Sequence, residues 1–186
     1  SFFASGSRSA TSDFIPAWVG TTLTPVEKLE VHQLGLRHMA VSVFVMAGDA
    51  VLIQKRAAGK YHTPGLWANT CCTHPEWGED PRDCAVRRLD EELGIRGVDP
   101  VWRDQVEYRA DVGNGLTEHE VVEIFVADAD KGLKLRLNPA EVSDTRWIGL
   151  ADLSDDTRKR PDRYTPWLRI YLDQHMDRIF GMSRAG

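Results

Sequence analysis

Length, composition and charge narrow the class of protein. The chain has 186 residues, 42% of them hydrophobic, so it is long enough for one domain with a sizeable core. Its net charge of -5 argues against a general binder of nucleic acid or of anionic membranes, because such proteins present a basic surface to phosphates. Any phosphate that the protein recognises is therefore expected to meet a few placed cations.

The cysteines indicate a reducing compartment. The chain has three of them, Cys71, Cys72 and Cys84. An odd number of cysteines, two of them adjacent, cannot form a disulfide framework. The sequence also contains no Cys-x-x-Cys pair, which would indicate a structural zinc module. We therefore expect a cytoplasmic protein.

The first 13 residues are rich in Ser, Ala and Gly. They have neither the basic start and apolar core of an export signal nor the length to span a bilayer. Because the chain starts with Ser rather than Met, we interpret residues 1–13 as a disordered tail or a remnant of processing or expression. Residues 14–186 are assigned to a single domain.

The first clear elements are two strands and a helix. β-prone residues over 38–46 and 50–55 flank a short turn with a glycine, which predicts a hairpin of two largely buried strands. Further on, Asp80 is a suitable N-cap before a first-turn proline, and Gly94 is a suitable stop, which predicts a helix over 81–93. Its apolar stripe is expected to consist of Ala85, Val86, Leu89 and Leu93.

The second half of the chain predicts more strands and a closing helix. Residues 101–110 and 119–127 flank a glycine-rich turn and read as strands, with a short strand at 146–148. Thr165 as N-cap and Pro166 at the first helical position start a helix that is expected to continue to Phe180, before a glycine. The predicted fold is therefore mixed α and β.

Two carboxylates are expected to share one strand face. Successive strand side chains alternate between faces, so Glu118 and Glu120 would lie on the same side as Val122 and Ile124, and His119 on the other. With the thiol and imidazole of the segment Cys71-Cys72-Thr73-His74-Pro75, this pair predicts a metal site combined with an acid/base pair.

One segment around the predicted helix at 81–93 reads His74-Pro-Glu-Trp-Gly-Glu79, seven residues, then Arg87-Arg-Leu-Asp-Glu-Glu92-Leu-Gly94-Ile95. It resembles the Nudix box, a loop-helix-loop that holds a divalent metal against a diphosphate. The resemblance implies an α+β Nudix fold, with a mixed β-sheet core sandwiched by helices. Thr73 stands where the first glycine is usual, and Arg88 replaces a glutamate with which hydrolytic members gather magnesium. This replacement argues against a hydrolase.

Further short motifs lie between residues 16 and 180, outside and around the box. They are Glu27-Lys28 with His32, Arg37-His38, Lys55-Arg56, Lys60, Pro64-Gly65-Leu66-Trp67, Asn69-Thr-Cys-Cys72-Thr-His74-Pro75, Tyr108-Arg109-Ala110, Glu118-His119-Glu120 and Thr165-Pro166-Trp167. In these motifs the chain resembles type one isopentenyl diphosphate isomerase, a branch of the Nudix superfamily. The matches lie on separate elements in the right order, which is more specific than any single motif. The implied reaction isomerises isopentenyl diphosphate to dimethylallyl diphosphate in isoprenoid biosynthesis.

The resemblance also implies two metal ions and a diphosphate site. One tightly bound divalent ion, manganese, zinc or magnesium, would be ligated by His32, His38, His74, Glu118 and Glu120. Glu92 would bind a magnesium ion that arrives with the substrate. The diphosphate oxygens would be met by Lys28, Arg56, Lys60 and Arg88. The remaining histidines, His62, His119 and His175, have no counterpart role.

The implied catalytic residues are Cys72, Glu120, Tyr108 and Trp167. Cys72 and Glu120 would carry the two proton transfers, with the order between them left open, and Tyr108 would support the carboxylate. Trp167 would stabilise the tertiary carbocation through its indole face.

Two other functions stay open at this point. A Nudix hydrolase could still hold magnesium through Glu79, Glu91 and Glu92. A non-enzymatic metal or diphosphate binder would explain the ligands but leave Cys72 without a role. The sequence does not decide between a monomer and a homodimer.

Overall fold

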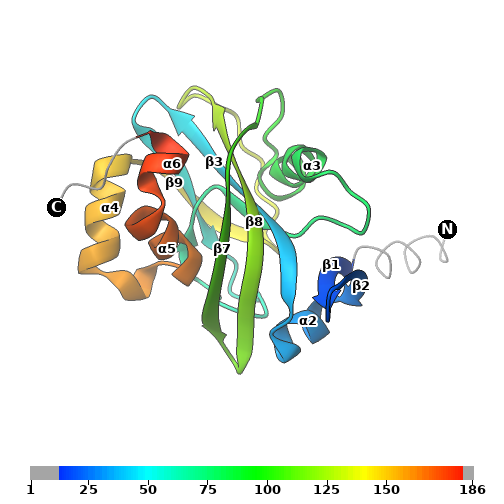
Figure 1. Cartoon of the computed structure of the whole chain (residues 1–186). Helices are drawn as coiled ribbons and strands as arrows, with labels where there is room; N and C mark the ends of the chain where they lie inside the picture. Colours follow the sequence, from blue (N-terminus) through cyan, green and yellow to red (C-terminus); the bar gives the residue numbers. More distant parts are fainter. Residues whose placement is uncertain (1–12, 182–186) are drawn as a thin grey trace.

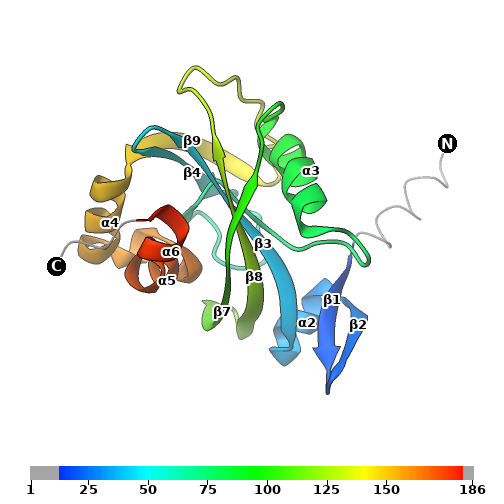
Figure 2. The same ribbon diagram turned by 45° about the horizontal axis from the view of Figure 1, so that its top comes forward.

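The computed structural model of the chain describes residues 13–181, in which a mixed nine-stranded sheet is covered by helices on both faces (Figure 1). The predicted tail, except for its last residue, lies outside the described residues. Helix α3 covers one face, and helices α4, α5 and α6 cover the other (Figures 1 and 2). This arrangement confirms the predicted mixed sheet between helices.

The centre of the sheet is strand β3 (Arg37–Ala47). It pairs in parallel with β8 (Leu116–Asp128), antiparallel with β6 (Cys71–Thr73), and over one end with β4 (Ala50–Arg56). The predicted hairpin at 38–55 is thereby confirmed.

Three further pairings extend the sheet. Strand β7 (Val101–Gly113) pairs with β8, so the predicted strands at 101–110 and 119–127 are confirmed and run longer than expected. The predicted short strand at 146–148 belongs to the longer β9 (Val142–Gly149), which pairs with β4, and β4 also pairs with the short β5 (Trp67–Ala68).

Helix α3 (Pro81–Leu93) has the predicted bounds. The Asp80 side chain accepts hydrogen bonds from the first-turn amides, and Gly94 ends the helix in the left-handed conformation, with φ of 66°. One part of the prediction was wrong: Val86 is 44% exposed and lies outside the buried stripe, because the face that packs on the sheet is rotated towards Cys84 and is formed by Cys84, Ala85, Leu89 and Leu93.

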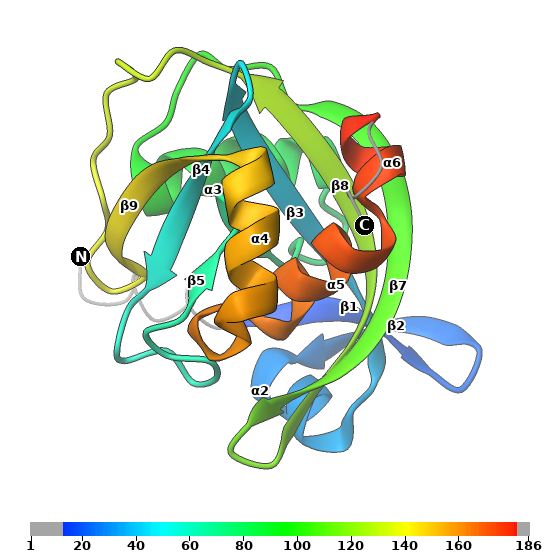
Figure 3. The same cartoon turned by 90° about the vertical axis from the view of Figure 1, so that its left-hand side faces the viewer.

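The sheet separates two hydrophobic cores. Val122 and Ile124 of β8 belong to the core beneath α4, α5 and α6, whereas Phe125 and Ala127 belong to the core beneath α3. Seen from the side of α4 and α5, these helices lie across the sheet with α3 behind it (Figure 3). The alternation of strand side chains inferred from the sequence therefore places Glu118 and Glu120 on the face that borders the core beneath α4, α5 and α6.

The N-terminal elements were not predicted. Strands β1 (Phe14–Val19) and β2 (Thr22–Glu27) form a hairpin, and helix α2 (Lys28–Leu34) follows directly. The helix is capped by the Glu27 side chain, which accepts hydrogen bonds from two first-turn amides. Glutamate is not among the preferred N-cap residues, so the cap carried no recognisable signal.

The C-terminal end differs from the single predicted helix. Helix α4 (Leu150–Lys159) was not predicted, and a 3-10 turn (Pro161–Arg163) follows it. The closing segment is divided at His175 into α5 (Pro166–Gln174) and α6 (Met176–Phe180). Thr165 occupies the N-cap position of α5, but its hydroxyl makes no capping hydrogen bond.

Among residues 13–181, no helix combines the length and apolar character needed to cross a bilayer.

Candidate active site

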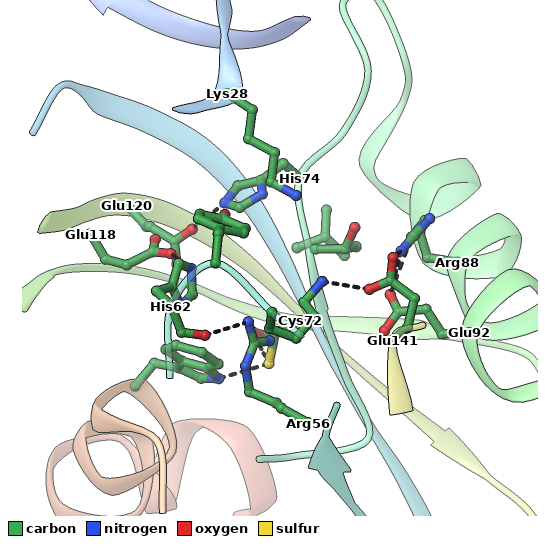
Figure 4. Close-up of a pocket in the computed structure, with 16 residues that line it drawn as sticks. Lys28, Arg56, His62, Cys72, His74, Arg88, Glu92, Glu118, Glu120 and Glu141 are labelled. Carbon is green, nitrogen blue, oxygen red and sulfur yellow. Dashed lines mark hydrogen bonds and ion pairs between the residues drawn. The ribbon is translucent and has the colours of Figure 1, made fainter. Parts of the chain in front are cut away.

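Most of the predicted site residues line one pocket between α2, α5, the sheet and the loop after β4 (Figure 4). They are Lys28, Arg56, Lys60, Cys72, His74, Arg88, Glu92, Glu118, Glu120 and Trp167. The other three, His32, His38 and Tyr108, do not line the pocket but contact its carboxylates directly. The structure therefore brings together every residue that the isomerase resemblance assigns to the site.

The pairing of the strands sets the positions of these side chains. In the parallel pair β3–β8, His38 lies opposite Glu120, and in the antiparallel pair β7–β8 Tyr108 lies opposite the same carboxylate. On the other side of β3, Cys72 lies opposite Ser42. His119 points to the opposite face of β8, as predicted, where its Nε2 lies 3.0 Å from a Glu107 carboxylate oxygen.

Three imidazoles and two carboxylates form a compact buried cluster. His32 Nε2 lies 2.9 Å from Glu118 Oε1, and His38 Nε2 lies 3.4 Å from Glu118 Oε2. Glu120 Oε2 lies 3.2 Å from His38 Nε2 and 2.9 Å from His74 Nε2. One candidate ligand atom from each of four residues lies within 4.8 Å of all the others: His32, His38, His74 and Glu118.

The donor pattern of this cluster fits a divalent cation. His32 Nδ1 lies 2.7 Å from the Lys28 carbonyl, and His38 Nδ1 lies 2.8 Å from the Leu36 carbonyl. Each Nδ1 must carry a proton to make these bonds, which leaves the Nε2 lone pairs facing carboxylate oxygens. Glu118 Oε2 is buried and has no hydrogen-bond donor. Lone pairs facing lone pairs need a proton or a metal ion between them.

The pKa values of these groups also indicate that the cluster requires protons or a metal ion. Burial lowers the pKa of His38, but hydrogen bonds to Glu118 and Glu120 outweigh it and raise the pKa to about 10. Burial and the neighbouring Glu118 charge raise the pKa of Glu120 to about 7. Burial also opposes ionisation of Glu118, yet the surrounding imidazoles hold its pKa well below the usual range. Without a metal ion, the cluster must take up protons.

The thiol of Cys72 is held between two side chains. Its S–H donates to Asn69 Oδ1 at 2.7 Å, and Trp167 Nε1 donates to its sulfur at 2.8 Å. Burial raises the pKa of Cys72 to about 12, so the group is a thiol at neutral pH. Near it, the hydroxyl of the buried Tyr108 donates a short hydrogen bond to Glu120 Oε1.

Four cationic side chains line the pocket: Lys28, Arg56, Lys60 and Arg88. Burial and the charges of Lys60 and Arg88 lower the pKa of Lys28 to about 8. The Arg56 guanidinium lies 5.3 Å from the centre of the Trp167 ring, and its buried Nε has no partner. Such an unsatisfied donor suits an anionic ligand.

Two carboxylates lie among these cations. Glu141 Oε2 lies 2.5 Å from Lys60 Nζ, and Glu141 Oε1 lies 3.6 Å from Arg88 Nη2. Glu92, which was predicted to bind a second ion, is buried, and its Oε2 lies 3.1 Å from Arg88 Nη2. Arg88 and Glu92 are four residues apart on helix α3, and this spacing puts both side chains on one face of the helix.

Sequence reasoning missed several residues of the pocket, among them Glu141 and His62. Glu141 belongs to a loop without a recognisable motif. His62 was given no role, but its Nε2 lies 2.8 Å from Glu118 Oε1. It follows Lys60, a matched position, by two residues, and this proximity is the only signal in the sequence that could have drawn attention to it.

Comparison with known proteins agrees with the fold. Residues 36–168 match the family described as the NUDIX domain. The crystal structure of a MutT NUDIX hydrolase from Burkholderia pseudomallei superposes with a TM-score of 0.57 at 25% identity, covering 75% of this chain and 98% of that chain. A crystal structure from Deinococcus radiodurans, with a TM-score of 0.60 and 13% identity over 72% of this chain and 80% of that one, supports the fold alone.

Two relatives found by sequence are far more similar in sequence than these two solved structures. The Isopentenyl-diphosphate Delta-isomerase of Cereibacter sphaeroides (strain ATCC 17029 / ATH 2.4.9) is 68% identical over 94% of this chain and 98% of its own length. The Dinoroseobacter shibae protein of the same name is 64% identical over 91% of this chain and 96% of its own length.

The fold and the loop-helix-loop at the pocket thus define a Nudix-domain protein. Within that class, the chain belongs to the isopentenyl-diphosphate Delta-isomerase family.

Proposed function

We propose that the protein isomerises isopentenyl diphosphate to dimethylallyl diphosphate, a step of isoprenoid biosynthesis. The observation that carries the proposal is the combination found in one pocket. A buried thiol and a carboxyl group with a raised pKa lie beside a cluster of cations. A diphosphate hydrolase has no need for the thiol, and a simple binder has no need for the acid/base pair.

Cys72 and Glu120 carry the two proton transfers. The reaction needs a proton delivered to an unactivated alkene and another removed from the carbon two positions along. One member of the pair delivers the first proton, and the other accepts the second. The buried carboxyl group of Glu120 borders the pocket, so it can exchange a proton with a bound substrate. The Tyr108 hydroxyl, bonded to Glu120 Oε1, holds that carboxyl group in place and can resupply its proton.

Trp167 stabilises the tertiary carbocation that protonation creates. Its indole borders the pocket, and its N–H is bonded to the Cys72 sulfur, which fixes the ring next to the reacting carbons. A cation over an indole face gains about 2 kcal/mol or more when water is excluded.

Lys28, Arg56, Lys60 and Arg88 bind the diphosphate. These four side chains bring local positive charge into an acidic protein, and a diphosphate requires such charge for tight binding. Glu92 lies within this group and is assigned to the magnesium ion that accompanies the substrate.

His32, His38, His74, Glu118 and Glu120 hold the tightly bound ion, which is manganese, zinc or magnesium. When bound, this ion supplies a positive charge that increases the acidity of a carboxyl group it contacts. The mixture of imidazole and carboxylate donors supports a borderline divalent ion.

The wider setting is part of the proposal. Residues 14–186 act as a single catalytic domain, as a monomer or a homodimer, in the cytoplasm. Cys71, Cys72 and Cys84 are all free thiols, which supports a reducing compartment.

Proton NMR of isopentenyl diphosphate in deuterium oxide tests the function. The purified protein is incubated with substrate, Mg²⁺ and Mn²⁺, and released phosphate is assayed in parallel. We expect deuterium-containing dimethylallyl diphosphate without phosphate release. Release of phosphate would replace the isomerase with a hydrolase. No reaction in a folded, metal-loaded sample would leave a binding protein.

A further inference from the structure

His62 is the one histidine at the pocket for which the family resemblance implies no role. It lies in the loop between β4 and β5 and is 3% exposed. Figure 4 shows it between Glu118 and Arg56. The side chain reaches Glu118, and the backbone carbonyl accepts a hydrogen bond from Arg56 Nη2 at 3.2 Å.

The contacts of His62 decide which nitrogen of its ring carries the proton. Thr63 Oγ1 lies 2.8 Å from His62 Nδ1, and Glu118 Oε1 lies 2.8 Å from His62 Nε2. A carboxylate oxygen only accepts, so Nε2 carries the proton and Nδ1 accepts from the threonine hydroxyl. The chain of donors therefore runs from Thr63 through His62 to Glu118.

The backbone beside His62 is held in a costly conformation. Thr63 has a φ of 45°, in the left-handed region that β-branched residues rarely adopt. Such a conformation costs on the order of 1–3 kcal/mol and persists only where the surroundings impose it. Here it places the threonine hydroxyl against the imidazole, and the Thr63 amide donates to the Val112 carbonyl at 3.3 Å.

The contact with His62 fixes the orientation of the Glu118 carboxylate. Oε1 receives His62 on one side and lies 2.9 Å from His32 Nε2, whereas Oε2 is buried without a donor and lies 3.4 Å from His38 Nε2. A hydrogen bond to one oxygen fixes the plane of the carboxylate and directs the other oxygen into the cluster of imidazoles.

We infer that His62 is a positioning residue for the divalent ion: by donating to Glu118 Oε1, it directs Glu118 Oε2 towards the metal held by His32, His38 and His74. The inference rests on the metal site of the proposed function. His62 is not itself among the side chains whose ligand atoms converge. Partners of metal-bound carboxylates typically change metal affinity about 10- to 100-fold when they are removed.

Metal titration of three variants tests this role. The probe is Mn²⁺ added to metal-free protein, with free Mn²⁺ followed by electron paramagnetic resonance. We expect His62→Ala to raise the Kd about 10- to 100-fold. His62→Gln, which keeps an N–H donor at a similar reach, should restore most of the affinity. His119→Ala is the matched control, because it removes another histidine–glutamate contact from the outer face of β8.

A kinetic readout separates positioning from collapse of the pocket. The contact with Arg56 uses the His62 backbone, so the KM for isopentenyl diphosphate at saturating Mn²⁺ should stay within about twofold in His62→Ala. Equal Mn²⁺ affinity in His62→Ala and wild type would overturn the role of His62 alone. Failure of His62→Gln to recover affinity would also contradict it. A wild-type protein that binds neither Mn²⁺ nor Zn²⁺ would remove the metal site, and this assignment with it.

Discussion

Lys28 is a cation of the pocket whose charge depends on pH near the neutral range. Its ammonium is buried among the cations of the pocket, and its pKa is lowered to about 8. A lowered lysine pKa means that the charged form is present below about pH 8 and is lost above it. If Lys28 binds the diphosphate, substrate affinity must fall over the same range.

We predict that the KM for isopentenyl diphosphate rises as the pH increases from about 8 to 10. Lys28→Arg should remove this rise, because an arginine keeps its charge throughout the range. Steady-state kinetics of both proteins at a series of pH values provide the measurement. Identical pH profiles would show that Lys28 is not the titrating group.

Tyr108 is predicted to act only through Glu120. A hydrogen bond to a charged group contributes about 1.5–3 kcal/mol, so Tyr108→Phe should lower kcat about 10- to 100-fold with little change in KM. Tyr171→Phe is the control: this tyrosine is also fully buried, but its hydroxyl lies 2.9 Å from Ser42 Oγ. Equal losses in the two variants would contradict a specific role for Tyr108.

Part of the site was predictable from individual residues. The shared face of Glu118 and Glu120 follows from strand alternation, and the structure confirms it. His62 and Glu141 could not be found in this way, because they lie in loops whose course is set by distant contacts. The Ala57 amide, for example, donates to the Glu141 carbonyl at 3.0 Å. No local pattern encodes such a contact.

At the scale of elements, helix α3 depends on a glycine at its end. Gly94 has a φ of 66°, and an added Cβ would lie 2.6 Å from Arg136 Cβ and 2.8 Å from its amide nitrogen. The segment after β8 runs close to this end, where Arg136 N donates to the Leu93 carbonyl and Asn138 N to the Glu92 carbonyl. The same segment leads to Glu141, so the helix end also fixes one wall of the pocket.

We predict that Gly94→Ala destabilises the protein by clearly more than Gly48→Ala. Both glycines have a positive φ, but nothing lies within 4 Å of a Cβ at Gly48. Gly48→Ala should therefore cost only the left-handed conformation, about 1–2 kcal/mol, and Gly94→Ala should add a backbone clash. Denaturant unfolding measures both. Equal losses of unfolding free energy would contradict the close approach of Arg136.

The elements differed in how well they could be predicted. Helix α3 has an aspartate cap, a first-turn proline and a glycine stop, and its predicted bounds are correct. Helix α2 has a glutamate cap and is only seven residues long. The N-cap position of α4 is Gly149, which makes no side-chain capping hydrogen bond. Elements of that kind are stabilised mainly by packing, which local signals do not report.

At the scale of the whole molecule, the sheet assembles a site from distant parts of the chain. His32 on α2 meets Glu118 on β8, 86 residues away, and Trp167 on α5 meets Cys72 on β6, 95 residues away. Lys28 and His32 both come from α2, so this N-terminal helix completes the site. The order of matching motifs indicated this convergence, but only the strand pairing explains its geometry.

The central claim is that this assembly moves protons through Cys72. The most direct test is the deuterium NMR assay applied to Cys72→Ala, with Cys84→Ala, a buried thiol in the other core, as the control. A proton-transfer group contributes about 10²- to 10⁴-fold, so Cys72→Ala should lose at least that much rate while Cys84→Ala keeps the wild-type rate. Mn²⁺ binding should be retained in both variants. Deuterated dimethylallyl diphosphate formed by Cys72→Ala at the wild-type rate would contradict the account.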